Sequence, residues 1–189
     1  MRLLINSPTL GGETALCCVN KMLVNLSEMK AQTMTTLEAG DKAPEFSNIP
    51  DQDGNKISLA DYEGKKLAIF FYPRDMTPTC TNQACNLRDN FVALQKAGIE
   101  ILGVNDDPET KHQKFIDKHS LPFPLLADTE RQVLQSYGVW GPKKFMGKVF
   151  DGTHRTTFLI GEDGNIVDVI KKVKAKEHDQ QVLEGFGLS

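Results

Sequence analysis

Beyond the N-terminal segment, apolar and polar positions form two alternating kinds of segment, which predict strands and helices. Two continuous apolar runs, "KLAIFFYP" (66–73) and "IEILGVN" (99–105), are typical of strands buried on both faces of a sheet. Short extended pieces around an Asp-Gly turn in "FSNIPDQDGNKISL" (46–59) predict a hairpin ahead of the first run. The segments "HRTTFLI" (154–160) and "NIVDVI" (165–170), joined by "GEDG", predict another hairpin at the sheet edge.

The intervening segments have apolar residues at helical spacing. One predicted helix has a shared apolar face and can end at Gly98 as its C-cap; the face is formed by Ala84, Leu87, Phe91 and Leu94. Three more helices and one short, proline-bounded strand are predicted, the helices over 107–120, 128–139 and 176–187 and the strand over 121–128. This order predicts an α/β fold with a mixed central sheet, helices on both faces and an N-terminal β-hairpin. A thioredoxin-like fold has this order, and so do other small α/β folds.

The composition is that of an ordinary globular protein. The 189 residues correspond to one domain plus some additional length, and 40% of them are hydrophobic. The net charge is −3 and no basic stripe is present, so the sequence does not predict nucleic-acid binding. No apolar run approaches the roughly 18 residues of a membrane-spanning helix, so no membrane span is predicted.

Residues 1–33 differ from the rest of the chain. They contain no phenylalanine or tryptophan, and Leu16, Val19, Leu23 and Leu26 have the spacing of a short amphipathic helix. The apolar "LLI" is interrupted at once by "NSPT", which argues against a secretory signal. We expect this segment to be an extension outside the core, through an over-long start assignment, and residues 34–189 to form the domain. A docked accessory helix and a targeting segment are the alternatives.

Cysteine is rare in this chain, and two of the four cysteines, Cys80 and Cys85, lie in the stretch "TPTCTNQAC". Four cysteines are too few for a secreted disulfide scaffold and are typical of a reducing compartment, which favours a cytoplasmic location. The close pair has four interpretations: a redox pair, a metal site, a structural disulfide, or two small buried side chains. The adjacent Cys17 and Cys18 are expected to be ordinary thiols, with an alternative redox partner or an intermolecular disulfide as the other interpretations.

Cys80 follows a strand and Pro73, at or near the first turn of a predicted helix. Unpaired N–H groups and the positive end of the helix dipole stabilise a thiolate there, and thiol pKa values fall to roughly 3.5–7.5 at such positions. Thr77 can contribute a hydroxyl or cap the helix. A thiol with a pKa of about 6 is ionised about 30-fold more at pH 7 than one of 8.5, but its lower nucleophilicity cancels about tenfold of this gain.

A catalytic Cys80 would therefore need help beyond its own ionisation. Hydrogen-bond donors aimed at the bond that polarises in the substrate are the usual source of such help. Arg74, beside the turn, and Arg155, at the start of an apolar strand, are the candidate cations.

Cys85 lies five residues after Cys80, which has a geometric consequence if both belong to one helix. Five residues rotate the side chain by about 500°, and the two Cα atoms then lie roughly 8–9 Å apart. A disulfide needs less than about 7 Å, so the helix has to unwind before the two sulfurs can join. A zinc site would need further ligands, and paired spacing is absent among the four histidines, which are His112, His119, His154 and His178.

The segment "FYPRDMTPTCTNQACNLRDNF" resembles the active-site segment of the peroxiredoxins, in particular the peroxiredoxin Q group, also called bacterioferritin comigratory protein. The family pattern Pro-x-x-x-Thr-x-x-Cys is met by Pro73, Thr77 and Cys80, and Cys85 matches the second cysteine of the Q group. The resemblance continues through "GDKAPEFSNIPDQDG" and "GVWGPKKFMGKVFDGTHRTTFLI" and covers residues 35–189. Residues 1–33 lie outside the family pattern.

The resemblance implies a thioredoxin-like fold and thiol-dependent reduction of hydrogen peroxide and organic hydroperoxides. It implies that Cys80 is the peroxidatic cysteine, that Pro73 shields it and that Thr77 hydrogen-bonds the sulfur and the peroxide. Arg155 would fix the peroxide and stabilise the thiolate, and Cys85 would be the resolving cysteine. The resemblance implies no haem, flavin or metal cofactor and implies thioredoxin or a similar dithiol protein as reductant, and it favours a monomer.

Two other functions share some of these features. A thiol–disulfide oxidoreductase usually has two residues between its cysteines, whereas four separate them here. A peroxide sensor would share every motif but would pass its disulfide to a regulator. Trp140, in "GVWGPKKFMGK", is expected to pack in the core or rim near the active-site face, with a role in docking thioredoxin as the alternative.

Overall fold

The computed structural model describes residues 35–145 and 147–188. The expectations for the N-terminal extension, including its predicted helix and Cys17 and Cys18, lie outside the described residues. No helix among the described residues has the length and apolarity needed to cross a membrane.

The core of the fold is a five-stranded mixed sheet with the strand order β5-β4-β3-β8-β9. Its strands are β3 (Lys66–Phe71), β4 (Ile99–Asn105), β5 (Leu125–Ala127), β8 (Thr156–Ile160) and β9 (Ile166–Ile170). β3, β4 and β5 run parallel, whereas β8 is antiparallel to both β3 and β9. The predicted hairpin at residues 154–170 is confirmed, but only β9 forms the edge, because β8 pairs with the central strand β3.

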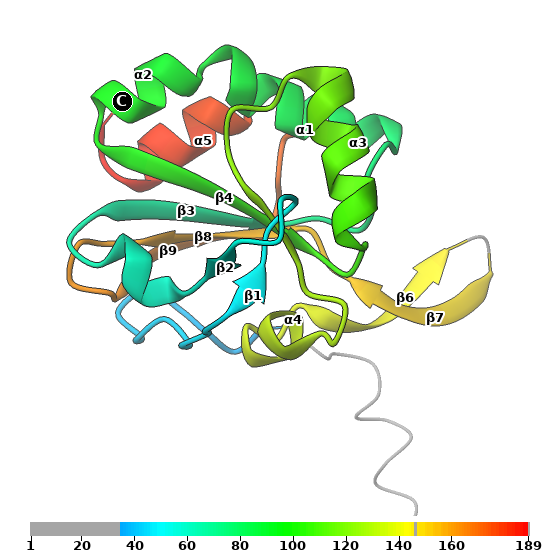
Figure 1. Cartoon of the computed structure of the whole chain (residues 1–189). Helices are drawn as coiled ribbons and strands as arrows, with labels where there is room; N and C mark the ends of the chain where they lie inside the picture. Colours follow the sequence, from blue (N-terminus) through cyan, green and yellow to red (C-terminus); the bar gives the residue numbers. More distant parts are fainter. Residues whose placement is uncertain (1–34, 146, 189) are drawn as a thin grey trace, which may run out of the picture. The chain divides into compact units, whose positions relative to one another are not determined.

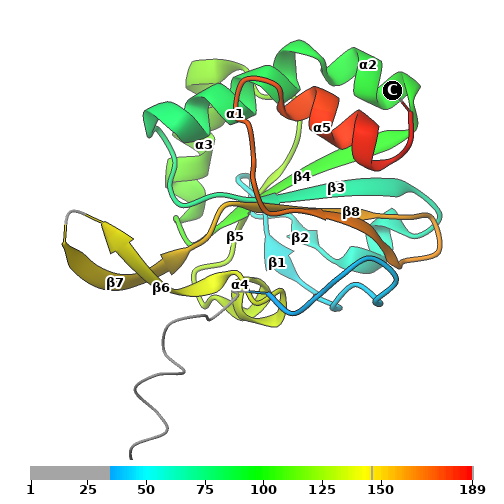
Figure 2. The same ribbon diagram turned by 180° about the vertical axis from the view of Figure 1, so that it is seen from behind.

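The helices cover both faces of this sheet, as predicted (Figure 1). One face packs against α1 (Pro78–Asp89), α2 (Phe91–Lys96), α3 (Glu109–His119) and α5 (His178–Gly185). The opposite face packs against α4 (Gln132–Ser136), a 3-10 helix (Leu59–Tyr62) and the predicted N-terminal hairpin, β1 (Ile49–Pro50) with β2 (Lys56–Ile57). The view from behind shows the same two layers (Figure 2). Alternate residues of the apolar strands therefore enter two separate cores.

One predicted helix is wrong in its extent. The periodicity predicts one helix up to Gly98, but the chain forms two helices that are separated at Asn90. Asn90 has backbone angles of φ −107° and ψ 10°, which end α1, and its side chain donates to the Asn86 carbonyl. The apolar face continues through both helices, since Leu87 and Leu94 are both buried. Periodicity alone therefore does not reveal the break.

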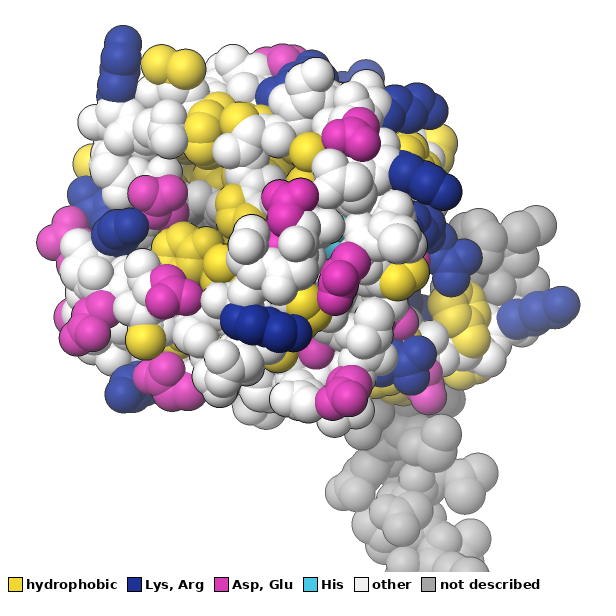
Figure 3. Space-filling view, viewed as in Figure 1, with side chains coloured by type: hydrophobic (Ala, Val, Ile, Leu, Met, Phe, Trp, Pro, Cys, Tyr) yellow, Lys and Arg dark blue, Asp and Glu magenta, His cyan; other side chains and the backbone are white. Residues whose placement is uncertain are grey.

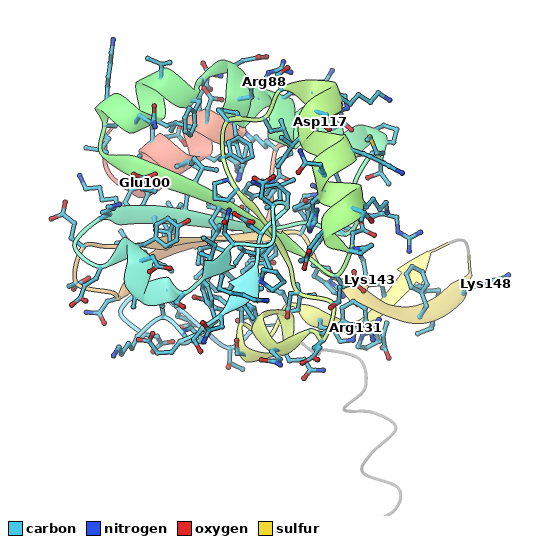
Figure 4. All side chains as sticks on the ribbon, in the orientation of Figure 1. Arg88, Glu100, Asp117, Arg131, Lys143 and Lys148 are labelled. Carbon is cyan, nitrogen blue, oxygen red and sulfur yellow. The ribbon has the colours of Figure 1, made fainter. Side chains whose placement is uncertain are left out.

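The structure contains a further hairpin, in addition to the two predicted ones, that the sequence did not predict. β6 (Trp140–Phe145) and β7 (Lys148–Thr153) pair with each other in an antiparallel ladder and project from the body of the domain (Figure 1). Lys143 lies within β6, opposite Phe150, and Lys148 lies near the tip of the hairpin (Figure 4). Most described side chains of β7 are exposed, so this strand lacks the burial alternation by which strands are recognised. The hairpin leads directly into the segment that carries Arg155.

Candidate active site

Cys80 lies in the first turns of α1, where strand β3 and a short turn deliver it. Thr77 is the N-cap of the helix and Pro78 its first residue, where the missing proline N–H costs no hydrogen bond. Cys80 is only 2% exposed and packs within the core that lies under α1. The preceding turn is sharp, since Met76 has a left-handed φ of 62°. A buried sulfur at the start of a helix is thus held by a turn that follows the central strand.

Arg155 places a fixed cation beside this sulfur. Its Nη2 donates a hydrogen bond to Cys80 Sγ at 3.0 Å, and its Nη1 donates to Gln83 Oε1. The two acceptors belong to the same face of α1, so one planar guanidinium bridges them. Arg155 comes directly before β8, the neighbour of the strand that leads to Cys80. The sheet therefore brings together two residues that are 75 positions apart in the sequence.

Gln83, on the same face of α1 as Cys80, leaves one polar group unused. The residue is 0% exposed, and its Nε2 atom has no hydrogen-bond partner among the described residues. A buried amide N–H without an acceptor costs about 1–3 kcal/mol, so this donor is available to an incoming oxygen. Together, the guanidinium and the amide can stabilise negative charge that develops next to Cys80.

Lys143 adds a second positive charge to this region. Its Nζ donates to the Thr153 carbonyl at 2.8 Å, which ties β6 to the end of β7, two residues before Arg155. Burial lowers the pKa of the Lys143 ammonium and the Arg155 guanidinium lowers it further, whereas charge on Cys80 acts in the opposite direction. The other candidate cation, Arg74, is exposed and makes no contact with the sulfur among the described hydrogen bonds. The structure thus favours Arg155 over Arg74.

Pro73 and Thr77 lie on either side of the turn. Both are partly buried, and Pro73 directly follows the buried Tyr72 at the end of β3. The Thr77 hydroxyl donates to the Arg74 carbonyl at 3.1 Å and makes no capping bond to the helix. In this structure, the hydroxyl therefore closes the turn.

A buried polar network supports the turn from behind. Asp75 and His112 are both fully buried, and the Asp75 carboxylate accepts hydrogen bonds from the Tyr72 hydroxyl and from His112 Nδ1, each at 2.8 Å. The other ring nitrogen of His112 lies 3.1 Å from the Leu126 carbonyl. Each ring nitrogen therefore faces an acceptor, which fixes the orientation of the imidazole. This buried pair was not predicted from the sequence, where the only signal was a histidine at a core position of α3.

Cys85 lies in the same intact helix as Cys80, and the structure leaves both thiols free. Cys85 is partly exposed, and its Sγ lies 3.8 Å from His119 Nδ1 at the end of α3. This agrees with the expectation that the two sulfurs cannot join while α1 is helical. From the sequence, His119 was expected to matter only as a possible metal ligand, and its contact with Cys85 was not predicted.

Asn86 anchors the C-terminal half of α1 independently of the first turn. Its side-chain amide donates to Asp179 Oδ1 at 2.8 Å and to the Lys176 carbonyl at 3.1 Å, and it accepts from the Asp179 N–H at 2.8 Å. These bonds connect α1 to the segment that starts α5. The two ends of α1 are therefore held by different parts of the fold.

Among the described residues, no group of three or more His, Cys, Asp and Glu side chains is arranged to hold a metal ion.

Trp140 packs against the core next to α4, and the Arg131 guanidinium lies 4.1 Å from its ring centroid. This stacking explains the partial burial of the indole.

Comparison with known proteins gives consistent results. The model of the AhpC/TSA family matches residues 39–169. Peroxiredoxin Bcp of Escherichia coli (strain K12) is 49% identical over 150 residues, which covers 79% of this chain and 96% of that protein. Peroxiredoxin Bcp of Bacillus subtilis (strain 168) is 41% identical over 149 residues, which covers 79% of this chain and 94% of that protein.

A solved structure supports the same relationship. The bacterioferritin comigratory protein of Xanthomonas campestris, studied for its alkyl peroxide reduction activity, superposes with a TM-score of 0.73 at 30% sequence identity. The match covers 82% of this chain and 97% of that protein. The similarity thus extends over nearly the whole length of these relatives.

Proposed function

Because this chain belongs to the AhpC/TSA family and is a peroxiredoxin, a thiol-dependent peroxidase, we propose that Cys80 is the residue that attacks the peroxide. The observation that carries this assignment is the hydrogen bond of 3.0 Å from Arg155 Nη2 to the buried Cys80 sulfur. A guanidinium in this position keeps the thiolate in place and lies next to the oxygen that becomes negative. Pro73 limits access of water to the sulfur, and Thr77 contributes its hydroxyl when the peroxide is bound.

In the first step, the Cys80 thiolate attacks one oxygen of the peroxide, an S–O bond forms and the O–O bond breaks. The leaving oxygen takes a proton and departs as water from hydrogen peroxide, or as an alcohol from an organic hydroperoxide. Cys80 is oxidised to a sulfenic acid. Arg155 and the unpaired amide of Gln83 are the donors that can stabilise the transferred charge.

In the second step, Cys85 is the resolving residue. α1 opens, the Cys85 sulfur attacks the Cys80 sulfur, and the S–O bond of the sulfenic acid breaks to release water. The resulting intramolecular disulfide is reduced by thioredoxin through thiol–disulfide exchange. The two sulfurs and a protein dithiol carry all the electrons, so the cycle needs no prosthetic group.

The remaining assignments concern the setting of the reaction. We assign hydrogen peroxide and organic hydroperoxides as substrates, a monomer as the working unit and the cytoplasm as the compartment, where a reducing environment maintains free thiols. Residues 34–189 form the peroxidase domain and residues 1–33 are dispensable for turnover. The start of the family match at residue 39 supports this division.

The test is NADPH consumption with thioredoxin, thioredoxin reductase and hydrogen peroxide. We expect turnover by the wild type, none by Cys80→Ser, and a stalled or over-oxidised Cys80 in Cys85→Ala. A Cys17→Ser, Cys18→Ser double variant is the matched control and should turn over like the wild type.

Other results would redirect the assignment. Turnover by Cys80→Ser would refute the scheme, whereas turnover by Cys85→Ala would retain the peroxidase and remove Cys85 from the resolving role. Oxidation of Cys80 without turnover would point to a peroxide sensor, and rapid insulin reduction to a thiol–disulfide oxidoreductase.

A further inference from the structure

The resolving sulfur has a basic group beside it that the scheme above does not use. His119 is the last residue of α3, and its Nδ1 lies 3.8 Å from Cys85 Sγ, within the distance of a sulfur hydrogen bond. A thiol is a weak donor and an imidazole nitrogen is a good acceptor. The contact therefore joins the proton of one reacting group to a side chain that can accept it.

The position of the imidazole is fixed by contacts on several sides. The Arg88 side chain donates to the backbone carbonyl of His119 at 2.6 Å, which ties the end of α3 to α1 three residues beyond Cys85. The His119 ring packs edge-on against Phe115, with 5.2 Å between the centroids. α3 ends here because Ser120 takes the left-handed conformation of a C-cap. His119 is thus placed by two helices and does not reach Cys85 by chance as a mobile surface side chain would.

The charges around His119 favour its neutral form. Arg88 faces it from α1 and Lys118 is its neighbour on α3; more generally, Lys and Arg side chains gather on the side of the domain that carries these helices (Figure 3). Loss of hydration lowers the pKa of His119 below its ordinary value of 6.5, and the charges of Lys118 and Arg88 lower it further.

The nearby carboxylates are engaged elsewhere. Asp89 binds Arg88, and Asp117 accepts a hydrogen bond from Gln113. Arg88 and Asp117 lie at the same end of α1 and α3 (Figure 4). A neutral imidazole with a proton on Nε2 presents a free lone pair on Nδ1 to the thiol.

We propose that His119 is the catalytic base of the resolving step, accepting the proton of the Cys85 thiol through Nδ1. While α1 is still helical, the Cys85 S–H bond breaks and its electron pair stays on sulfur as a thiolate. After α1 opens, this electron pair forms the S–S bond with Cys80 as the S–O bond of the sulfenic acid breaks. The departing hydroxide takes a proton from the solvent and leaves as water, and the imidazolium returns its proton to the solvent. The Cys85 sulfur is oxidised and the Cys80 sulfur is reduced, so no further reactant is needed. This inference rests on the proposed resolving role of Cys85.

The size of the effect follows from the ionisation of a thiol. A cysteine with an ordinary pKa of about 8.5 is only about 3% thiolate at pH 7, so a neighbouring base can raise the rate by up to about 30-fold. The gain vanishes above about pH 9, where the thiol ionises without help. A base therefore leaves a pH signature that a packing role does not.

The test is a single turnover with one equivalent of hydrogen peroxide, quenched with a thiol-alkylating reagent and analysed for the Cys80–Cys85 disulfide by mass spectrometry. We expect His119→Gln, which keeps a polar group but no base, to form the disulfide about 10- to 30-fold more slowly at pH 7. Its rate should rise with pH and approach that of the wild type near pH 9. Lys114→Gln, on the exposed side of α3, is the matched control and should behave like the wild type.

Consumption of the first equivalent of peroxide should be unchanged in His119→Gln, since Cys80 lies in a separate site. Slower resolution should also raise the yield of Cys80 sulfinic acid under excess peroxide. Equal rates and pH profiles in wild type and His119→Gln would overturn the inference, as would a slow rate that pH 9 does not restore. A wild-type protein that forms no Cys80–Cys85 disulfide would instead overturn the proposed function.

Discussion

The two sulfurs of α1 lie in opposite kinds of surroundings. Cys80 is 2% exposed and is held by the Arg155 guanidinium, whereas Cys85 is partly exposed and is faced by the His119 imidazole. A permanent cation stabilises a sulfur anion but cannot take its proton, while a neutral imidazole can. The difference shows that one helix can carry two thiols with separate tasks, one prepared as a nucleophile and the other prepared to lose a proton.

The structural support around the two sulfurs also differs. The turn before Cys80 is tied to α3 and β5 through the Asp75 and His112 side chains, both 0% exposed. The helix around Cys85 is held instead by the Asn86 side chain, which bonds the start of α5, and by the Arg88 side chain, which bonds the end of α3. A rigid turn suits a site that must keep its geometry during attack.

The largest expected effect comes from removing one partner of the buried ion pair. Asp75→Ala leaves the His112 imidazole buried without its carboxylate, so we expect the free energy of unfolding to fall by about 3–5 kcal/mol. Urea denaturation monitored by circular dichroism measures this change. The Asp75→Ala, His112→Leu double variant removes both members of the pair and should recover most of the loss. A double variant no more stable than Asp75→Ala would contradict the role of the pair.

Removing the Arg155 cation should lower the reactivity of Cys80 and leave that of Cys85 unchanged. Arg155→Met is expected to lower the second-order rate constant with hydrogen peroxide by about 10²–10³, the usual effect of losing one donor to a developing negative charge. Arg155→Lys keeps the charge but cannot bridge the Cys80 sulfur and Gln83 as a planar fork does, so we expect it to restore only part of the rate. Stopped-flow kinetics measures both variants. An unchanged rate in Arg155→Met would remove the guanidinium from the peroxide reaction.

The fold and the site differ in how far the sequence could predict them. Strands β3 and β4 were predicted because continuous apolar runs are long enough to cross a buried sheet. The β6–β7 hairpin was missed because glycine, proline and exposed side chains hide its register. The family resemblance pointed to Cys80 and Arg155, and the sheet then brought them within hydrogen-bonding distance.

The contacts of His112 and His119 could not be predicted in the same way. Asp75 and His112 are 37 residues apart, and Cys85 and His119 are 34 residues apart. These pairs meet only because α3 packs beside α1 and the turn before it. Neither spacing nor periodicity in a single sequence specifies such a contact, since it depends on how two helices dock.

The last expected effect is the acid sensitivity of stability, which distinguishes the buried His178 from His119 beside Cys85. His178 is 0% exposed, lies 3.0 Å from the Thr157 hydroxyl, and has a pKa lowered by burial to about 4. The unfolded chain binds the proton near pH 6.5, so stability should be lost as the pH falls from about 6.5 to about 4, by on the order of 3 kcal/mol.

The measurement is the free energy of unfolding against pH for wild type, His178→Gln and His119→Gln. His178→Gln should lose this part of the acid sensitivity, whereas His119→Gln should retain it. The same slope in all three proteins would assign the acid sensitivity to other groups.

The break at Asn90 limits the length of the helix that has to open and therefore bears on how fast it can open. Since α1 ends at Asp89 and α2 begins at Phe91, the helix that has to open contains only 12 residues. Helices of this length are marginal on their own, and helix–coil relaxation takes roughly 0.1–1 μs in peptides of about 20 residues. Enzymes commonly turn over about 1–10³ times per second. A 12-residue helix by itself would therefore melt far faster than a catalytic cycle, so the time needed to open α1 is set by the release of its packing and of anchors such as the Asn86 hydrogen bonds.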